Sequence, residues 1–199
     1  MNDRTIAVFD FDGTITTKET FLPFLFEVFG RGRVFKSLAR LGPEAILLGI
    51  GISNRDKFKE HLVQSLFSGE SVDRLRAMGT QYANTLKPLL RPAALKQIEW
   101  HKSKDHRCVM VSASLDLYLN DVAKTLGFSD LLCTVLSHNN QVFTGGFKEG
   151  NCRSKEKVNR LQSLLGDLKT YTIFAYGDSL DDLDVMALAD YQYYCHFET

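Results

Sequence analysis

The strongest constraint on this chain is an apolar run that ends in two aspartates. Residues 6–9 are Ile, Ala, Val and Phe, and Asp10, Asp12 and Gly13 follow directly. A short apolar run that is rich in β-branched and aromatic residues and closed by glycine is typical of a buried strand. In open α/β sheets, ligands bind outside the carboxyl ends of the strands. The sequence therefore predicts that a first strand carries Asp10 and Asp12 to such a site.

This stretch by itself leaves two interpretations open. Gly13 allows a bend and a close approach of the backbone to an anion, so both carboxylates could face one reacting atom, and Thr14 adds a hydroxyl. Aspartate and glycine are also ordinary turn residues, and a polar turn after a strand would look the same. The motifs that follow along the chain decide between the two.

Composition argues against several classes of protein. The 199 residues suffice for one domain, or for a core domain with a smaller insertion. Lys and Arg total 24, as do Asp and Glu, and this balance gives no support to nucleic-acid binding, which usually needs a basic excess. No apolar stretch reaches the length of about 18 residues that suggests a membrane-spanning helix.

Cysteine usage and the first residues suggest a cytoplasmic protein. The four cysteines (Cys108, Cys133, Cys152 and Cys195) are widely spaced and form no CxxC pair, so we expect neither a zinc site nor a disulfide framework. Buried free thiols suit a reducing compartment. Residues 2–4 lead into the first strand without the pattern of a signal peptide.

The rest of the chain alternates between strand and helix patterns. Apolar runs predict strands at 106–111, 131–136, 170–176 and 191–197, and helical patterns lie between them at 91–101, 115–126, 154–165 and 179–188. Turn residues at 139–140 and 144–146 predict a short hairpin. The alternation predicts an α/β fold with a Rossmann-like, doubly wound parallel sheet.

Residues 16–86 show helical patterns and no clear strand. A crossover between parallel strands needs only about a dozen residues or more, so this segment is far too long for a simple connection. We expect residues 16–86 to form an inserted helical cap, and residues 1–15 and 87–199 to form the core. Helices are predicted at 55–67 and 71–86, and shorter pieces at 34–41 and 44–50.

Three of the predicted strands end in polar residues. The first ends at Asp10 and Asp12, the second at Ser112, and the fourth at Asp178, with Asp182 four residues further on. The carboxyl ends of parallel strands meet at one edge of a sheet, so we expect these side chains to converge. Clustered carboxylates need a cation, and oxygen ligands favour Mg²⁺.

These residues resemble the motifs of the haloacid dehalogenase-like phosphatase superfamily. Residues 10–14 match its DxDGT motif, Ser112 matches its strand-ending Ser or Thr, and residues 177–182 match its GDSxxD motif. The helical insertion after the first strand resembles the phosphoserine phosphatase branch. The phrases at 20–25, 111–119 and 151–154 look closest to uncharacterised members of that branch, some relatives of which act on phosphatidylglycerophosphate.

The resemblance implies a role for each motif residue. Asp10 would be the nucleophile that forms an aspartyl-phosphate, and Asp12 would protonate the leaving oxygen and then activate water. Asp10, the Asp12 carbonyl and Asp178 would hold Mg²⁺, and Asp182 would orient the metal shell. The groups implied to bind the phosphate belong to Asp12, Gly13, Thr14, Ser112, Ala113 and a lysine.

The family's lysine offsets the negative charge of the nucleophile and the phosphate, and two candidates stand near the start of one predicted helix. From Lys157, Leu161 and Leu164 lie on the same helical face, which favours Lys157 as the residue directed inward. Lys155 follows a serine, as in phosphoserine phosphatases, and stays open as the alternative. Both could also be solvated surface lysines.

Substrate choice is expected to lie in the cap. Glu19 matches an acid that contacts the substrate amine in phosphoserine phosphatases, although an acid at a helix start would look the same. The arginine that holds the serine carboxylate in that family has no clear counterpart, although Arg55, Lys59 and His61 lie nearby. The basic residues of 31–52 could contact an anionic lipid surface, or form an ordinary cap helix.

The leading hypothesis is a Mg²⁺-dependent phosphomonoester hydrolase. Its substrate would be a small phosphorylated metabolite such as phosphoserine, or a phospholipid headgroup phosphate. A receiver-type phosphoryl-accepting domain would also use strand-end aspartates and Mg²⁺ on a parallel sheet, but the long insertion and Asp12 argue against it. A binding protein that keeps this fold without turnover is the third hypothesis.

Overall fold

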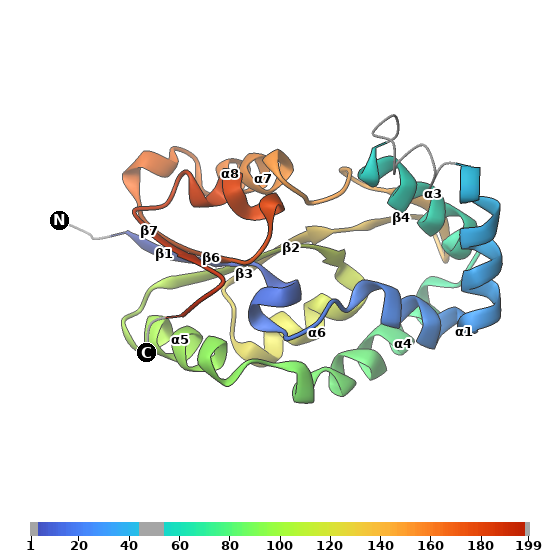
Figure 1. Ribbon diagram of the computed structural model, residues 1–199, viewed down its shortest axis with the longest axis horizontal. Helices are drawn as coiled ribbons and strands as arrows, with labels where there is room; N and C mark the ends of the chain where they lie inside the picture. Colours follow the sequence, from blue (N-terminus) through green and yellow to red (C-terminus); the bar gives the residue numbers. More distant parts are fainter. Residues whose placement is uncertain (1–3, 44–53, 198–199) are drawn as a thin grey trace.

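The computed structural model describes residues 4–43 and 54–197, and a five-stranded parallel sheet lies at its centre (Figure 1). The strand order is β3-β2-β1-β6-β7, and each neighbouring pair is parallel. The strands are β1 (Thr5–Phe9), β2 (Arg107–Leu115), β3 (Asp130–Thr134), β6 (Thr172–Gly177) and β7 (Tyr191–Tyr194). The predicted Rossmann-like parallel sheet is confirmed.

Helices cover both faces of this sheet. In Figure 1, α7 (Lys155–Leu165) and α8 (Leu183–Met186) lie above it, and α5 (Pro92–Ser103) and α6 (Asp116–Leu126) lie below. Successive residues of β1 accordingly enter two different cores: Ala7 belongs to the core on the α5–α6 side, and Val8 to the core on the α7–α8 side. This double burial explains why β1 is a continuous apolar run without a polar face.

The insertion after β1 is helical and lies beyond one end of the sheet. It contains α1 (Phe21–Arg40), α3 (Arg55–Phe67) and α4 (Val72–Thr85). The helix α1 bends at Gly30, which has a φ of 74°. The piece predicted at 44–50 lies outside the described residues. Among the described helices, none combines the length and the apolar content that crossing a membrane requires.

A hairpin from the second half of the chain joins the helical insertion. Strands β4 (Leu136–Asn139) and β5 (Val142–Phe147) are antiparallel. The N–H of Phe143 donates to the carbonyl of Glu70, and the N–H of Gly69 donates to the carbonyl of Phe143, both at 2.9 Å. The predicted strand at 131–136 therefore ends at Thr134, because Leu136 already pairs in the hairpin.

The predicted helix at 179–188 is shorter than expected. A 3-10 turn over Leu180–Asp182 precedes the four-residue α8. A capping box closes this turn: the Ser179 hydroxyl accepts a hydrogen bond from the N–H of Asp181, and the Asp182 carboxylate accepts one from the N–H of Ser179. This tight turn holds Asp182 at the sheet edge.

The contact between α4 and α6 depends on one glycine. A Cβ atom at Gly79 would lie 2.1 Å from the carbonyl oxygen of Leu117, at the start of α6. Gly32, in the exposed part of α1, has no heavy atom within 4 Å of the same position. Glycine is therefore required at the first position by packing, and not at the second.

We expect Gly79→Ala to lower the free energy of unfolding by about 1–3 kcal/mol, because the helices must separate to admit a methyl group. The control Gly32→Ala should be neutral or stabilising by up to about 1 kcal/mol, because alanine has the higher helix propensity. Urea denaturation followed by circular dichroism measures both. Equal midpoints for the two variants would contradict the packing argument.

Candidate active site

A tight turn at the end of β1 delivers the two aspartates. The N–H of Asp10 still donates to the carbonyl of Tyr176 on the neighbouring strand, at 2.9 Å. The next five residues, Phe11–Ile15, form an irregular turn in which Gly13 has a φ of 77°. A Cβ atom on Gly13 would lie 2.1 Å from the Asp178 carboxylate, so only glycine lets the turn pack against β6.

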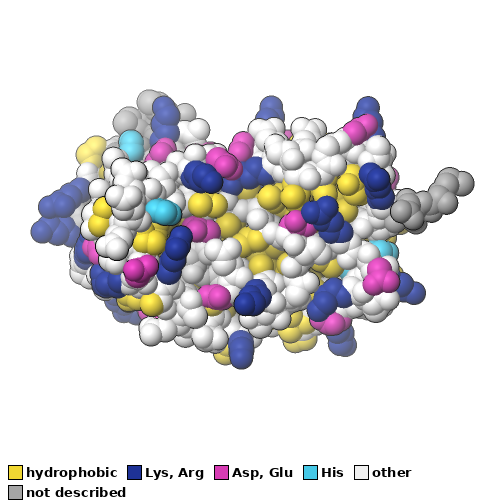
Figure 2. All heavy atoms as spheres, turned by 180° about the vertical axis from the view of Figure 1, so that it is seen from behind, with side chains coloured by type: hydrophobic (Ala, Val, Ile, Leu, Met, Phe, Trp, Pro, Cys, Tyr) yellow, Lys and Arg dark blue, Asp and Glu magenta, His cyan; other side chains and the backbone are white. Residues whose placement is uncertain are grey.

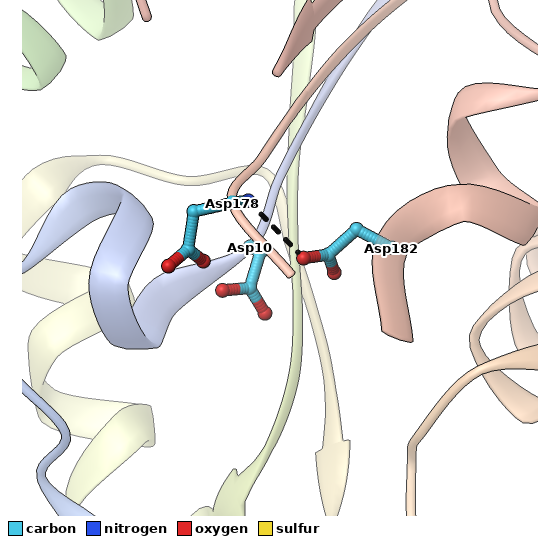
Figure 3. A group of neighbouring side chains, drawn as sticks. All are labelled: Asp10, Asp178 and Asp182. Carbon is cyan, nitrogen blue, oxygen red and sulfur yellow. Dashed lines mark hydrogen bonds between the residues drawn. The ribbon is translucent and has the colours of Figure 1, made fainter. Parts of the chain in front are cut away.

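Three carboxylates converge at this edge of the sheet. Asp10 follows β1, Asp178 follows β6 and Asp182 comes from the capped turn, and each offers an oxygen within 4.8 Å of the others. Figure 3 shows the Asp10 carboxylate between the other two. One oxygen of Asp182 accepts hydrogen bonds from the N–H groups of Asp178 and Ser179, which fixes its orientation.

Lys157 is the lysine that reaches this group. It lies in the first turn of α7, its side chain is 3% exposed, and its Nζ atom lies 2.6 Å from both Asp10 and Asp182. Lys155 is exposed. Burial by itself would lower the pKa of Lys157, but the charges of the two aspartates outweigh it and raise the pKa, so the ammonium stays charged.

The group is still short of positive charge. Burial raises the pKa of Asp10 to about 8, and the ammonium of Lys157 opposes this only in part. The pKa of Asp178 is raised by burial too, and the charge of Asp182 adds to it. A hard cation would relieve this repulsion, and a set of carboxylate oxygens fits Mg²⁺. The residues present therefore suit the ion that the sequence predicts.

Asp12 is held apart from these three carboxylates. One of its oxygens accepts hydrogen bonds from the N–H and the hydroxyl of Thr20, at 2.7 and 2.6 Å, and the other accepts one from the Ser114 hydroxyl. Burial raises the pKa of Asp12, and these hydrogen bonds oppose the rise. A metal contact through its backbone carbonyl stays a prediction.

The predicted phosphate-binding residues fall on two sides of the turn. Ser112 and Ala113, at the end of β2, line the same cavity as Asp10, Asp12 and Lys157. Gly13 and Thr14 instead line a second cavity, next to Asp178. In this structure the Thr14 hydroxyl donates to the Asp178 carboxylate, at 3.1 Å, so it orients that acid. The predicted phosphate contacts of Gly13 and Thr14 stay predictions.

The first cavity has a volume of about 410 Å³ and is lined by residues of both the core and the helical insertion. Its further lining residues include Glu19, Phe21, Arg55, Asp56, Lys59, Asn151, Arg153 and Asp181. Glu19 lies exposed at the rim, where partial loss of hydration and, after it, the charge of Asp12 raise its pKa. The residues with no role in the sequence prediction are Thr20, Ser114, Asn151 and Arg153. Their only signal was their position in the segments 20–25, 111–119 and 151–154, which resemble uncharacterised family members.

Lys59 connects the insertion to the core. Its Nζ atom donates to the Ala113 carbonyl at 2.5 Å and to the Asn151 side chain at 3.0 Å, and it lies 4.6 Å from the centre of the Phe21 ring. Burial lowers its pKa to about 8. Arg55 also lines the cavity, whereas His61 is not among its lining residues.

The outer surface carries charges of both signs. On the face in Figure 2, Lys and Arg side chains are interspersed with Asp and Glu. Within the predicted basic segment 31–52, Arg33 forms an ion pair with Glu70 at 2.6 Å. Residues 44–52 of that segment lie outside the described part of the chain, and lipid contact stays a prediction.

Comparison with known proteins places these motifs in a family. The model of the haloacid dehalogenase-like hydrolases matches residues 7–187. The chain belongs to this family. It is 35% identical over 192 residues to the protein CicA of Caulobacter vibrioides, which covers 95% of this chain and 85% of CicA. The predicted family is therefore confirmed, and the chain is a hydrolase.

Two further relatives of this hydrolase carry more specific names. A probable phosphatase of Mycobacterium tuberculosis is 26% identical over 191 residues, which cover 92% of this chain and 66% of that protein. A phosphoserine phosphatase solved with its substrate bound superposes with a TM-score of 0.64 at 16% identity, over 96% of this chain and 86% of that one. At this identity, the superposition shows a shared fold.

We expect Mg²⁺ to raise the melting temperature of the hydrolase. An ion that binds only the folded state, present at a hundred times its Kd, adds about 2.7 kcal/mol to the free energy of unfolding. Asp178→Asn should weaken this effect, and without Mg²⁺ it should be at least as stable as the wild type because one repelling charge is gone. Thermal denaturation with and without Mg²⁺ measures both effects.

The matched control is Asp184→Asn, on α8, because Asp184 is not one of the three converging carboxylates. It should keep the full response to Mg²⁺. A response of Asp178→Asn equal to that of the wild type would exclude Asp178 as a ligand.

Proposed function

We propose that this hydrolase is a Mg²⁺-dependent phosphatase that cleaves small phosphomonoesters through an aspartyl-phosphate on Asp10. The observation that carries this proposal is that Asp10, Asp12 and Lys157 line one cavity. The Nζ atom of Lys157 lies 2.6 Å from the Asp10 carboxylate. A nucleophile, a fixed cation and an acid beside one cavity are the parts that a covalent phosphoryl transfer needs.

The residues divide the reaction into two steps. Lys157 holds one oxygen of Asp10. In the first step, the other oxygen attacks phosphorus, the ester P–O bond breaks, and Asp12 gives its proton to the departing alkoxide. In the second step, Asp12 takes a proton from water, the resulting hydroxide attacks phosphorus, and inorganic phosphate leaves Asp10 free. Asp12 ends each cycle protonated again.

Hydrogen-bond donors, a lysine and a metal ion would together stabilise the negative charge of the phosphate. Ser112 and the Ala113 N–H lie in the cavity wall, where they can donate to phosphoryl oxygens, and Lys157 supplies a fixed positive charge. Asp10, Asp178 and Asp182 would hold Mg²⁺. When bound, the ion adds positive charge at the phosphate and neutralises the carboxylates.

The cavity favours a small polar leaving group. Its volume of about 410 Å³ lies near the lower end of typical ligand sites. Glu19 can meet an ammonium group, and Lys59 an anion. Phosphoserine, the substrate of the phosphoserine phosphatase named above, carries both groups. Phosphoserine or a phospholipid headgroup phosphate would therefore find partners in Glu19 and Lys59. A receiver domain would have no use for Asp12 as an acid beside a leaving-group cavity.

Asp10→Asn is expected to abolish turnover and phosphoenzyme formation while leaving the fold intact. Loss of the nucleophile of a covalent hydrolase can cost on the order of 10⁶-fold in kcat, so activity should fall below detection. Phosphate release is measured with Mg²⁺ on a panel of phosphoserine, sugar phosphates, nucleotides and phosphatidylglycerophosphate in detergent. Acid-quenched protein is examined for the phosphoaspartate by mass spectrometry.

The control for this experiment is again Asp184→Asn, which should keep its activity. Undiminished turnover by Asp10→Asn would refute the proposed mechanism. A stable phosphoaspartate on the wild type, without phosphate release, would instead favour the receiver-type function.

Glu19→Gln is expected to lower kcat/KM for amine-bearing esters such as phosphoserine and phosphoethanolamine by about tenfold, the loss of roughly one charge-assisted hydrogen bond. Amine-free esters of similar size, such as glycerol phosphate, should be affected far less. Steady-state kinetics on both classes measures the difference. An equal effect on both would mean that Glu19 does not contact an amine.

A further inference from the structure

The proposed acid, Asp12, has both carboxylate oxygens held by hydroxyl groups. The Thr20 hydroxyl donates to Oδ1 at 2.6 Å, and the Ser114 hydroxyl donates to Oδ2 at 2.5 Å. Thr20 is fully buried and Ser114 is 2% exposed, so water does not compete for these hydroxyls. The two come from different parts of the fold, the start of α1 and the end of β2.

The two oxygens of Asp12 are held in different ways. Oδ1 also accepts the backbone N–H of Thr20, at 2.7 Å, and an N–H group can only donate. The Thr20 hydroxyl has one proton, which it gives to Oδ1. While the Thr20 hydroxyl donates to Oδ1, the Tyr118 hydroxyl, 3.0 Å away, is the donor to the Thr20 oxygen. The N–H of Thr20 can only donate, and with the Thr20 hydroxyl it already supplies Oδ1 with two hydrogen bonds, which favours Oδ2 as the atom that carries the transferable proton.

The loop that carries Thr20 is itself anchored. The Tyr82 hydroxyl, on α4, donates to the Thr20 carbonyl at 2.8 Å. Tyr82 and Tyr118 are both buried, and their rings pack at 5.2 Å between centres. Two helices thus fix the Oδ1 side of Asp12, and the transferable proton is left to Oδ2.

Ser114 is the partner of the oxygen that carries this proton. A serine hydroxyl can rotate, so it can donate to ionised Oδ2, or to the second lone pair of Oδ2 while that atom holds its proton. The N–H of Ser114 donates to the Ser112 hydroxyl oxygen at 3.0 Å, which ties Ser114 to a proposed phosphate-binding residue. Asp12, Ser112 and Ser114 all line the cavity.

We propose that Ser114 is a positioning residue for the general acid: its hydroxyl holds Oδ2 of Asp12 toward the leaving group and stabilises the carboxylate as the proton departs. In this step the O–H bond of Asp12 breaks and the proton joins the alkoxide as its P–O bond breaks. This inference rests on the proposed phosphatase function. It assigns a use to the second serine of the 112–114 segment.

The proposal predicts a dependence on the leaving group. An alkoxide is a poor leaving group and needs the proton from Asp12, whereas p-nitrophenolate leaves without one. kcat/KM covers only the steps up to departure of the leaving group, so the later use of Asp12 as a base does not enter it. A defect in the acid should therefore appear with alkyl esters and be small with the aryl ester.

The experiment compares Ser114→Ala with the wild type on glycerol phosphate and p-nitrophenyl phosphate. General-acid catalysis contributes about 10²–10⁴-fold. Loss of its positioning should lower kcat/KM for glycerol phosphate by up to about 100-fold, with a change under about threefold for p-nitrophenyl phosphate. Ser114→Thr keeps a hydroxyl and should restore most of the alkyl activity. The ratio of the two values is independent of the folded fraction, so partial unfolding does not imitate the effect.

The matched control is Ser37→Ala, because Ser37 is a buried serine on α1 that does not line the cavity. Its ratio of the two kcat/KM values should equal that of the wild type. Equal losses on both esters in Ser114→Ala, or no loss on either, would overturn the positioning role. Asp10→Asn would still be inactive in that case, so the proposed function would stand. An active Asp10→Asn would instead remove the proposed function itself.

Discussion

The buried ammonium of Lys157 is the interaction on which this site depends. It lies 2.6 Å from two carboxylates that come from opposite ends of the chain, Asp10 after β1 and Asp182 near α8. Without it, the charges at the sheet edge would repel one another at close range in a poorly hydrated space. Removing one partner of such a buried group typically costs about 3–5 kcal/mol. The helix α7 is thereby tied to the strand ends.

The single ammonium of Lys157 does not balance the charge of these carboxylates completely. Asp10, Asp178 and Asp182 share one ammonium, and under the proposed function a divalent cation would neutralise the remaining charge so that a phosphate could approach. Asp12 is kept outside this balance. Thr20 and Ser114 hold it beside the same cavity by hydrogen bonds from neutral hydroxyl groups, where the proposed mechanism needs an acid.

Residues of the helical insertion and of the core together line the cavity. Lys59 of α3 donates to the Ala113 carbonyl, and Tyr82 of α4 anchors the Thr20 carbonyl. Helices α3 and α4 of the insertion therefore both contact residues that line or anchor the cavity wall. The hairpin β4–β5 packs on these helices although it lies far along the chain, because its strand β5 continues the backbone hydrogen bonding at Glu70.

Local patterns in the sequence determined the parallel sheet, most of the helices, and the gathering of Asp10, Asp178 and Ser112 at one edge, because hydrophobic period and strand-end polarity are local properties. The helical face shared with Leu161 already favoured Lys157. Only the tertiary structure decided that Thr14 serves Asp178, that the β4–β5 hairpin joins the insertion, and that Thr20 and Ser114 hold Asp12. Each of these is a contact between residues whose neighbours in the sequence give no sign of it. They depend on how the turn after β1 bends and on how the helices pack, and no local pattern records either.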